Sequence, residues 1–220
     1  PETHHPRGDR RVSIPYAVGF TCGETCSSWF VDCLVRLAVV ERPPFIQVIA
    51  GPLPHRNRNM LTALFLNWRH PETGEQAERL VMLDSDIVFS VKDVHRLLEH
   101  DVPIVSGVYP SAAGKMMMIG AGFMAIHRSV LEALLPHPFN PVTLDDGTVS
   151  GEDVGFHMNA KAKGFEAVVD QNIAVGHAKT QILQLVEAGD RPIEVLSFGK
   201  DRPAPKGQAD VEVGLPIGFA

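Results

Sequence analysis

The stretch RLVMLDSD, residues 79–86, constrains the fold more than any other part of the chain. Residues 80–83, LVML, are apolar at consecutive positions, and side chains alternate along a β-strand. A strand formed here therefore has apolar side chains on both faces, as central strands of α/β proteins do. The chain must then supply helices to cover both faces of the sheet that contains this strand.

Strand-like and helix-like segments alternate along most of the chain. Strand-like apolar runs occur at 11–20, 45–51, 79–86 and 102–110. Helix-like segments lie between and after them, at 21–41, 56–70 and 90–101. Two further units, 116–135 and 150–170, each predict one strand and one helix. This alternation predicts a three-layer α/β/α sandwich with a mostly parallel central sheet.

Several residues predict where helices begin, end or face the core. Ser90 is expected to cap the helix that follows it, and Gly164 is expected to close another. A further helix is expected from about Ser129. For the helix at 56–70 the apolar side is predicted to consist of Met60, Leu61, Leu64, Phe65 and Trp68.

The chain has 220 residues, which suits one medium domain with an appendage. We expect a single domain over 1–180. Residues 181–220 are expected to form a C-terminal helix, centred on TQILQLVEAG, and an irregular tail that packs on the domain or extends from it.

Charge and hydropathy exclude some classes of protein. The net charge is -6 with histidine neutral, which disfavours general binding to nucleic-acid backbones, although short basic stretches occur at 4–11 and 55–59. No apolar run reaches the roughly 18–20 residues that a membrane helix needs. The three cysteines, Cys22, Cys26 and Cys33, have neither CxxC nor disulfide-framework spacing, so we expect free thiols and a cytoplasmic protein.

Two carboxylates, Asp84 and Asp86, follow the apolar strand. In an extended segment they would project the same way, into the crevice where ligands of open α/β sheets bind. Like charges in one small space are unfavourable unless a cation, a proton or an arginine offsets them. All-oxygen ligands suit Mg²⁺ or Mn²⁺. A turn former beside a helix cap would explain the same tripeptide without any ligand.

Four other groups of residues are candidates for a site, and each also has a purely structural explanation. Glu152 and Asp153 at a helix start are favoured by the helix dipole. His177 follows a short apolar run, where a histidine is more often structural. The remaining candidates are Gly120, Ala121 and Gly122, which allow close backbone approach, and Arg56, Arg58 and Asn59, which could meet a diphosphate or solvate a helix end.

Taken in this order, these segments resemble GT-A-fold glycosyltransferases, a Rossmann-like fold. The resemblance covers roughly residues 11–180 and is nearest to inverting, family-2-like enzymes, including small ones of bacteria and phages. It implies a cytoplasmic enzyme, in a bacterium or a phage-infected cell, that moves a sugar from a UDP- or GDP-sugar to an acceptor hydroxyl.

The resemblance also implies roles for the candidate residues. Asp86 would bind Mn²⁺ or Mg²⁺, Asp84 would contact the ribose or support the metal, and His177 would complete the coordination. Asp153 would be the general base, with Glu152 as its positioning neighbour. The donor and acceptor pocket would be lined by Gly120, Ala121 and Gly122, and the nucleotide would lie near Arg56, Arg58 and Asn59.

Other functions compatible with the sequence are a sugar-phosphate nucleotidyltransferase, a non-catalytic nucleotide-sugar-binding protein and a metal-dependent phosphohydrolase. The loop GFTCGETCSSW lacks the basic residue that a nucleotidyltransferase usually carries there. The acceptor is left open between a glycan or small molecule and a hydroxymethylated DNA base. Stereochemistry and oligomeric state are left open as well, and the short stretch PSAAGKMMM after Tyr109 is compatible with an open acceptor site.

Overall fold

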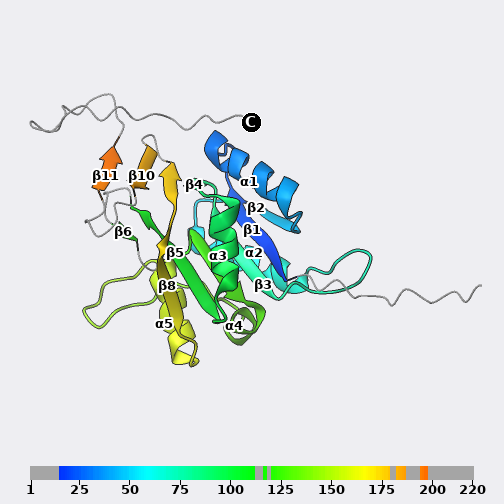
Figure 1. Cartoon of the computed structure of the whole chain (residues 1–220). Helices are drawn as coiled ribbons and strands as arrows, with labels where there is room; N and C mark the ends of the chain where they lie inside the picture. The colour runs from blue at the N-terminus through cyan, green and yellow to red at the C-terminus, as the bar shows by residue number, and fades with distance from the viewer. Residues whose placement is uncertain (1–14, 112–115, 118–119, 179–181, 187–193, 198–220) are drawn as a thin grey trace, which may run out of the picture.

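The computed structural model describes residues 15–111, 116–117, 120–178, 182–186 and 194–197 (Figure 1). Its main sheet has seven strands in the order β2-β1-β3-β7-β5-β6, with β8 paired to β5. The strands are β1 (Tyr16–Cys22), β2 (Phe45–Ile49), β3 (Arg79–Asp84), β5 (Ile104–Pro110), β6 (Met116–Met117), β7 (Phe123–His127) and β8 (Ala167–Ala174). Only β7 and β6 run against the other five, so the prediction of a mostly parallel sheet is confirmed.

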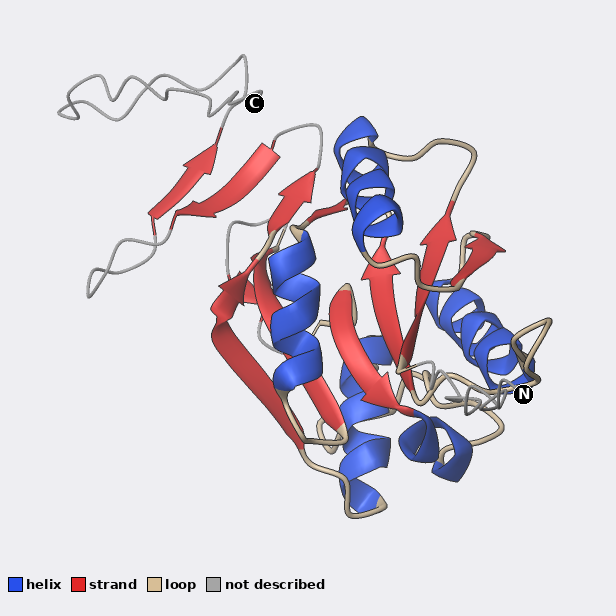
Figure 2. Cartoon of the chain, turned by 45° about the vertical axis from the view of Figure 1, so that its right-hand side comes forward, coloured by secondary structure: helices blue, strands red, loops and turns tan. Residues whose placement is uncertain are grey.

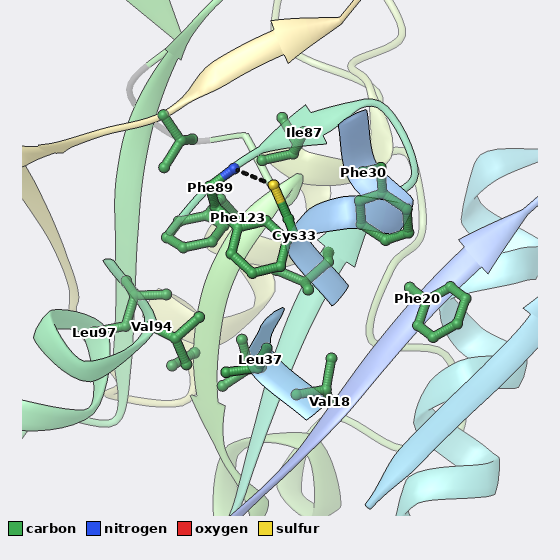
Figure 3. Close-up of a cluster of buried hydrophobic side chains, with 14 of the residues drawn as sticks. Val18, Phe20, Phe30, Cys33, Leu37, Ile87, Phe89, Val94, Leu97 and Phe123 are labelled. Carbon is green, nitrogen blue, oxygen red and sulfur yellow. Dashed lines mark hydrogen bonds between the residues drawn. The ribbon is translucent and has the colours of Figure 1, made fainter. Parts of the chain in front are cut away.

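Helices cover both faces of this sheet, which confirms the three-layer sandwich (Figure 2). One face is covered by α1 (Ser28–Val40) and α3 (Val91–Glu99), and the other by α2 (Pro54–Asn67), α4 (Arg128–Ala133) and α5 (Glu152–Ala162). Figure 3 shows the core under α1, where Phe30, Cys33 and Leu37 meet side chains of α3 and the sheet. The backbone N–H of Phe89 donates to the Cys33 Sγ across this core at 3.3 Å.

The central strand β3 explains the two cores. Val81 and Leu83 belong to the core under α1 and α3, whereas Leu80 and Met82 belong to the core under α2, α4 and α5. All four side chains are almost completely buried. The apolar run in the sequence therefore has the two-sided burial that we predicted from it.

The predicted helix ends are also confirmed. Ser90 caps α3, and Asp93 completes a capping box by accepting from the Ser90 backbone N–H at 2.8 Å. Gly164 lies just past α5 with a φ of 84°, a left-handed conformation that glycine adopts readily. The helix expected from about Ser129 is α4.

The predicted C-terminal helix is wrong where the structure describes that segment. Residues 182–186 form a strand, β10 (Ile182–Val186), in a second sheet of order β11-β10-β9-β4. The other strands are β11 (Glu194–Ser197), β9 (Gly176–Ala178) and β4 (Ile87–Val88). A short apolar run fits a strand or a helix equally well, and pairing with β9 and β11 decides the outcome here. The rest of the predicted tail lies outside the described residues.

The predicted apolar side of α2 is wrong in part. Leu61 and Phe65 are buried as expected, but Met60 and Leu64 are 56% and 45% exposed. The buried side instead includes Thr62 and the charged residue Arg58. The prediction assumed that only apolar residues face the core. Because Arg58 and Thr62 are buried as well, the actual buried face is rotated relative to the predicted one.

The cysteine prediction is wrong for two of the three residues. Cys22 and Cys26 form a disulfide, with their Cα atoms 6.0 Å apart. The three cysteines do not share one helix as expected. Cys22 ends β1, α1 begins only at Ser28, and the connecting loop returns Cys26 to Cys22. Cys33 is a free, buried thiol, as predicted.

None of the helices in the described part of the chain is long and apolar enough to cross a membrane.

The contact between α5 and the chain before it predicts a sensitive glycine. A Cβ on Gly155 would collide with the backbone oxygen of Asn140, whereas a Cβ on Gly151 would meet nothing within 4 Å. Gly155→Ala should therefore lower the free energy of unfolding by about 1–3 kcal/mol, as overpacked substitutions do. Urea denaturation measures this. Gly151→Ala is the matched control, and equal losses for both variants would contradict the packing described.

Candidate functional site

A cavity of about 400 Å³ opens at the carboxyl ends of β1, β2 and β3. Because these three strands are parallel neighbours, the residues that follow them meet at one edge of the sheet. The cavity is lined by Thr21, Ala50, Gly51, Pro54, Asn57, Arg58, Asp84, Ser85, Asp86 and Glu152. Four of the residues predicted from the sequence therefore lie around one cavity: Arg58, Asp84, Asp86 and Glu152.

The guanidinium of Arg58 is the centre of this site. Its Nη1 and Nη2 atoms donate to the two carboxylate oxygens of Asp84 at 2.8 and 3.1 Å. Its Nε lies 3.5 Å from a carboxylate oxygen of Glu152 and 3.5 Å from one of Asp153. Burial alone would lower the pKa of Arg58, but the surrounding carboxylates raise it, so the arginine is charged. One buried cation is thus shared by three carboxylates.

The charges at the site do not balance. Asp84, Glu152 and Asp153 together carry three negative charges against the single positive charge of Arg58. Asp86 adds another carboxylate to the cavity wall. Like charges in one partly buried space repel unless a cation or a proton joins them. The cavity is therefore suited to a cation, and an anionic group can enter it favourably only together with one.

Asp153 is a carboxylate of this site whose pKa is raised, mainly through its burial. Burial, reinforced by the neighbouring Glu152, raises the pKa of its carboxyl from 3.8 to about 6, against the opposing effect of Arg58. The backbone amide of Ala121 hydrogen-bonds to the same carboxylate. At neutral pH Asp153 is ionised but is a stronger base than an ordinary aspartate, which is the property a general base needs.

Asp86 and His177 form the second pair of the site. β4 begins directly after Asp86 and pairs with β9, so that Ile87 lies opposite His177, and the Ala178 N–H donates to the Asp86 carbonyl at 2.6 Å. This pairing leaves the His177 Nε2 3.2 Å from the Asp86 Oδ2. The His177 Nδ1 is 2.7 Å from the Pro110 carbonyl oxygen, which can only accept. Nδ1 therefore carries a proton, and Nε2 is the ring nitrogen that faces the Asp86 carboxylate.

The two aspartates do not project from one extended segment, as the sequence suggested. The chain turns at Ser85 and Asp86. Asp84 consequently pairs with Arg58, whereas Asp86 pairs with His177. In the part of the chain that the structure describes, no three His, Cys, Asp or Glu side chains are close enough to hold a metal ion by themselves.

A carboxylate beside an imidazole nitrogen still suits a divalent cation that takes its other ligands from elsewhere. Mg²⁺ and similar ions are commonly held by one or two protein ligands, with substrate phosphates and water completing the shell. Asp86 and His177 fit this arrangement. Asp84 fits it less well, because both of its oxygens accept hydrogen bonds from Arg58.

The three small residues at 120–122 lie behind the cavity wall. A Cβ on Gly120 would collide with the hydroxyl of Tyr109, and one on Gly122 would lie 2.7 Å from that hydroxyl and 2.9 Å from the Asp84 Oδ2. The Gly122 N–H donates to the Tyr109 hydroxyl at 3.0 Å. These glycines therefore allow Tyr109 and Asp84 to lie against the backbone. None of the three residues lines the cavity itself.

The first turns of α2 hold two further loops. The Asn57 side chain bonds to both the N–H and the carbonyl of Gly51, at 3.0 and 2.9 Å. Asn59 accepts from the Phe139 N–H at 2.9 Å. Of the predicted nucleotide-binding residues, Arg58 lines the cavity, Asn59 supports the loop before α5, and Arg56 is exposed outside the residues that line it.

The sequence analysis missed the cavity residues Thr21, Ala50, Gly51, Pro54, Asn57 and Ser85. The first three end the strands β1 and β2 or follow them directly, so the strand ends themselves were the available signal. Asn57 gave no signal of its own.

Comparisons with known proteins bear mainly on the fold. No protein-family model and no curated protein matches the sequence. Among solved structures, A197 from STIV is similar with a TM-score of 0.52 and 16% identity, over 86% of this chain and 99% of that one, which shows a shared fold. A glycosyltransferase involved in the glycosylation of the major capsid of PBCV-1 has a TM-score of 0.41 and 15% identity, over 70% of this chain and 82% of that one. A score this low supports no inference.

The shared guanidinium predicts a large effect of removing it. Arg58→Met leaves Asp84, Glu152 and Asp153 without their counter-charge, so the free energy of unfolding should fall by about 3–5 kcal/mol, as when one partner of a buried ion pair is removed. Arg58→Lys should restore part of the loss. Chemical denaturation at pH 7.5 measures both.

Arg56→Met is the matched control for this prediction. Arg56 lies two residues earlier on the same helix and is exposed, so its loss should change the free energy of unfolding by less than about 0.5 kcal/mol. Similar losses for the two arginine variants would contradict the central role of Arg58.

The raised pKa of Asp153 predicts a pH-dependent stability. Its protonation stabilises the folded state below the unfolded pKa of 3.8, and this contribution is lost as pH rises through about 6. Asp153→Asn cannot ionise, so at pH 7.5 it should be more stable than the wild type by up to about 3 kcal/mol. Denaturation at pH 4.5 should show most of this difference gone. The prediction would be contradicted if the stability that Asp153→Asn gains over the wild type were smaller at pH 7.5 than at pH 4.5.

Proposed function

We propose that this protein is a glycosyltransferase that moves a sugar from a nucleoside diphosphate sugar to an acceptor hydroxyl and needs Mn²⁺ or Mg²⁺. The observation that carries the proposal is the arrangement of one cavity at the carboxyl ends of parallel strands. Asp86, which pairs with His177, and Glu152 line this cavity, and Asp153 lies beside Glu152 against Arg58. The order of motifs in the sequence supports the same function.

The charge of the cavity favours a donor that arrives with a cation. A diphosphate alone would be repelled by Asp84, Asp86 and Glu152, which outnumber Arg58. Asp86 and His177 would hold the divalent cation, which when bound neutralises the charge of the leaving nucleoside diphosphate. Arg58, fixed by Asp84, reduces the repulsion from the carboxylates without occupying the ligand positions.

The rest of the cavity would hold the nucleoside. Thr21, Ala50 and Gly51 present backbone and small side chains at the ends of β1 and β2, and Asn57 fixes the position of Gly51. This wall is largely uncharged, in contrast to the wall formed by Asp84 and Asp86. A UDP- or GDP-sugar would thus place its base away from the carboxylates and its diphosphate toward Asp86.

Asp153 would act as the general base. It takes the proton from the acceptor hydroxyl while that oxygen bonds to the anomeric carbon and the bond from this carbon to the diphosphate oxygen breaks. Attack from the face opposite the leaving group inverts the configuration. The raised pKa of Asp153 suits this role, and the Ala121 amide and Arg58 fix its position. Glu152, which lines the cavity, would orient the acceptor hydroxyl.

The charges also bear on the acceptor. Four carboxylates, Asp84, Asp86, Glu152 and Asp153, lie at or beside the cavity, and Asp145 and Asp146 are exposed in the loop that leads into α5. A polyanion such as DNA would approach this surface against repulsion. An uncharged hydroxyl compound, such as a glycan, is therefore the acceptor we propose over a hydroxymethylated DNA base.

Ligand-dependent melting tests the donor site. UDP or GDP should raise the melting temperature in the presence of Mn²⁺ or Mg²⁺ and not in EDTA, because only the folded protein has the cavity. Asp86→Ala should abolish the shift, and His177→Ala should lower the apparent affinity for the metal by about ten-fold or more, at least the loss that follows removal of a partner of a metal ligand. His137→Ala, an exposed position outside the cavity, is the control. An undiminished shift for Asp86→Ala would exclude the metal role of Asp86.

Asp153→Asn separates binding from chemistry. This variant should keep the metal-dependent shift but lose transfer to a neutral glycoside acceptor by about 100-fold or more, the size of effect expected for a general base. Glu152→Gln should lose less. If Glu152→Gln loses transfer and Asp153→Asn retains it, the base is Glu152.

A further inference from the structure

Helix α1 has two apolar stripes on opposite sides. Phe30, Cys33 and Leu37 form the buried stripe. Val31, Val35 and Val39 follow one another at intervals of four residues, which places them on a single line along the helix, and they are 45%, 55% and 70% exposed. A helix that is apolar on both sides is normally buried on both sides.

The sheet covered by α1 also carries exposed apolar side chains. In β2, Phe45 and Ile49 are 38% and 83% exposed. Their register partners in β1 are Val18 and Cys22, which belong to the core that α1 covers. Phe45 and Ile49 therefore lie on the same face of the sheet as α1. This side of the molecule thus carries several exposed apolar side chains, a feature of interaction surfaces when they gather together.

The charged residues of α1 indicate the occupant of the stripe. Asp32 and Arg36 are the only charged residues of this helix and lie beside the valines, joined by a salt bridge of 2.7 Å. If a second α1 packs antiparallel, with the two-fold axis near Leu34, Asp32 lies opposite the partner's Arg36, and Arg36 lies opposite the partner's Asp32. A parallel pair would instead place like charges together. The surface is thus complementary to itself in the antiparallel arrangement.

We propose that α1 of one molecule packs antiparallel against α1 of a second copy of this chain, through the stripe Val31, Val35 and Val39, and that Asp32 and Arg36 set the register. A membrane surface fits the stripe less well. Helices that lie on membranes carry lysines and arginines on their polar face, whereas α1 has one arginine and its opposite face is in the core. The contact between two helices is small, so the dimer is expected to be weak and concentration-dependent.

Sedimentation velocity over a wide range of concentrations tests this directly. The wild type should shift from monomer to dimer as concentration rises, and Val35→Asp should weaken association by about ten-fold or more, since it places two carboxylates at the two-fold axis. Val39→Asp provides a second variant at the more exposed position. Leu64→Asp is the control, because Leu64 has the same exposure as Val31 but lies on α2, on the opposite face of the sheet.

Charge exchange tests the register. Arg36→Asp should weaken the dimer, because it places only negative charges along the contact. The double variant Asp32→Arg with Arg36→Asp should restore it, since the salt bridges within and between the helices are formed again with their signs exchanged. Circular dichroism and melting temperature confirm that each variant is folded.

Three results would overturn the proposal. They are a wild type that remains monomeric at every concentration, a dimer that Val35→Asp and Val39→Asp leave unchanged, and a monomer that sediments with neutral phospholipid vesicles through the same valines. The proposal does not depend on the proposed enzymatic function, and no nucleotide is needed to test it.

Discussion

The buried guanidinium of Arg58 holds together three parts of the chain, two of which carry carboxylates that would otherwise repel one another. It extends from α2, holds Asp84 at the end of β3 with two hydrogen bonds, and lies between Glu152 and Asp153 at the start of α5. An arginine can do this because its planar fork presents several donors in fixed directions. The positions of the carboxylates, and therefore the shape and charge of the cavity, depend on this one cation.

The same cation separates the roles of two neighbouring aspartates. Asp84 ends β3 and is engaged by Arg58, while the turn at Ser85 directs Asp86 toward His177. One carboxylate thus helps to fix the scaffold, and the next faces an imidazole at the cavity wall. Burial raises the pKa of Asp153 to about 6, because the shared Arg58 opposes this shift only in part and the neighbouring Glu152 adds to it.

Much of the fold was predictable because burial on both faces of β3 leaves few alternatives. An apolar run such as 80–83 requires two covering layers, and the alternation of segments supplied them. The location of Asp84 and Asp86 at the cavity was predictable for a related reason, since parallel strands place their carboxyl ends at one edge of the sheet. These inferences needed only local pattern and sheet geometry.

The parts that were not predictable depend on partners distant in sequence. Apolar periodicity could not place Arg58 on the buried side of α2, because its burial is favourable only where Asp84, Glu152 and Asp153 meet it. The strand at 182–186 exists because β9 offers it an edge. A partner distant in sequence thus decides whether a charged residue is buried and whether a short apolar segment forms a strand. The sequence pattern alone does not identify that partner, and the folded structure does.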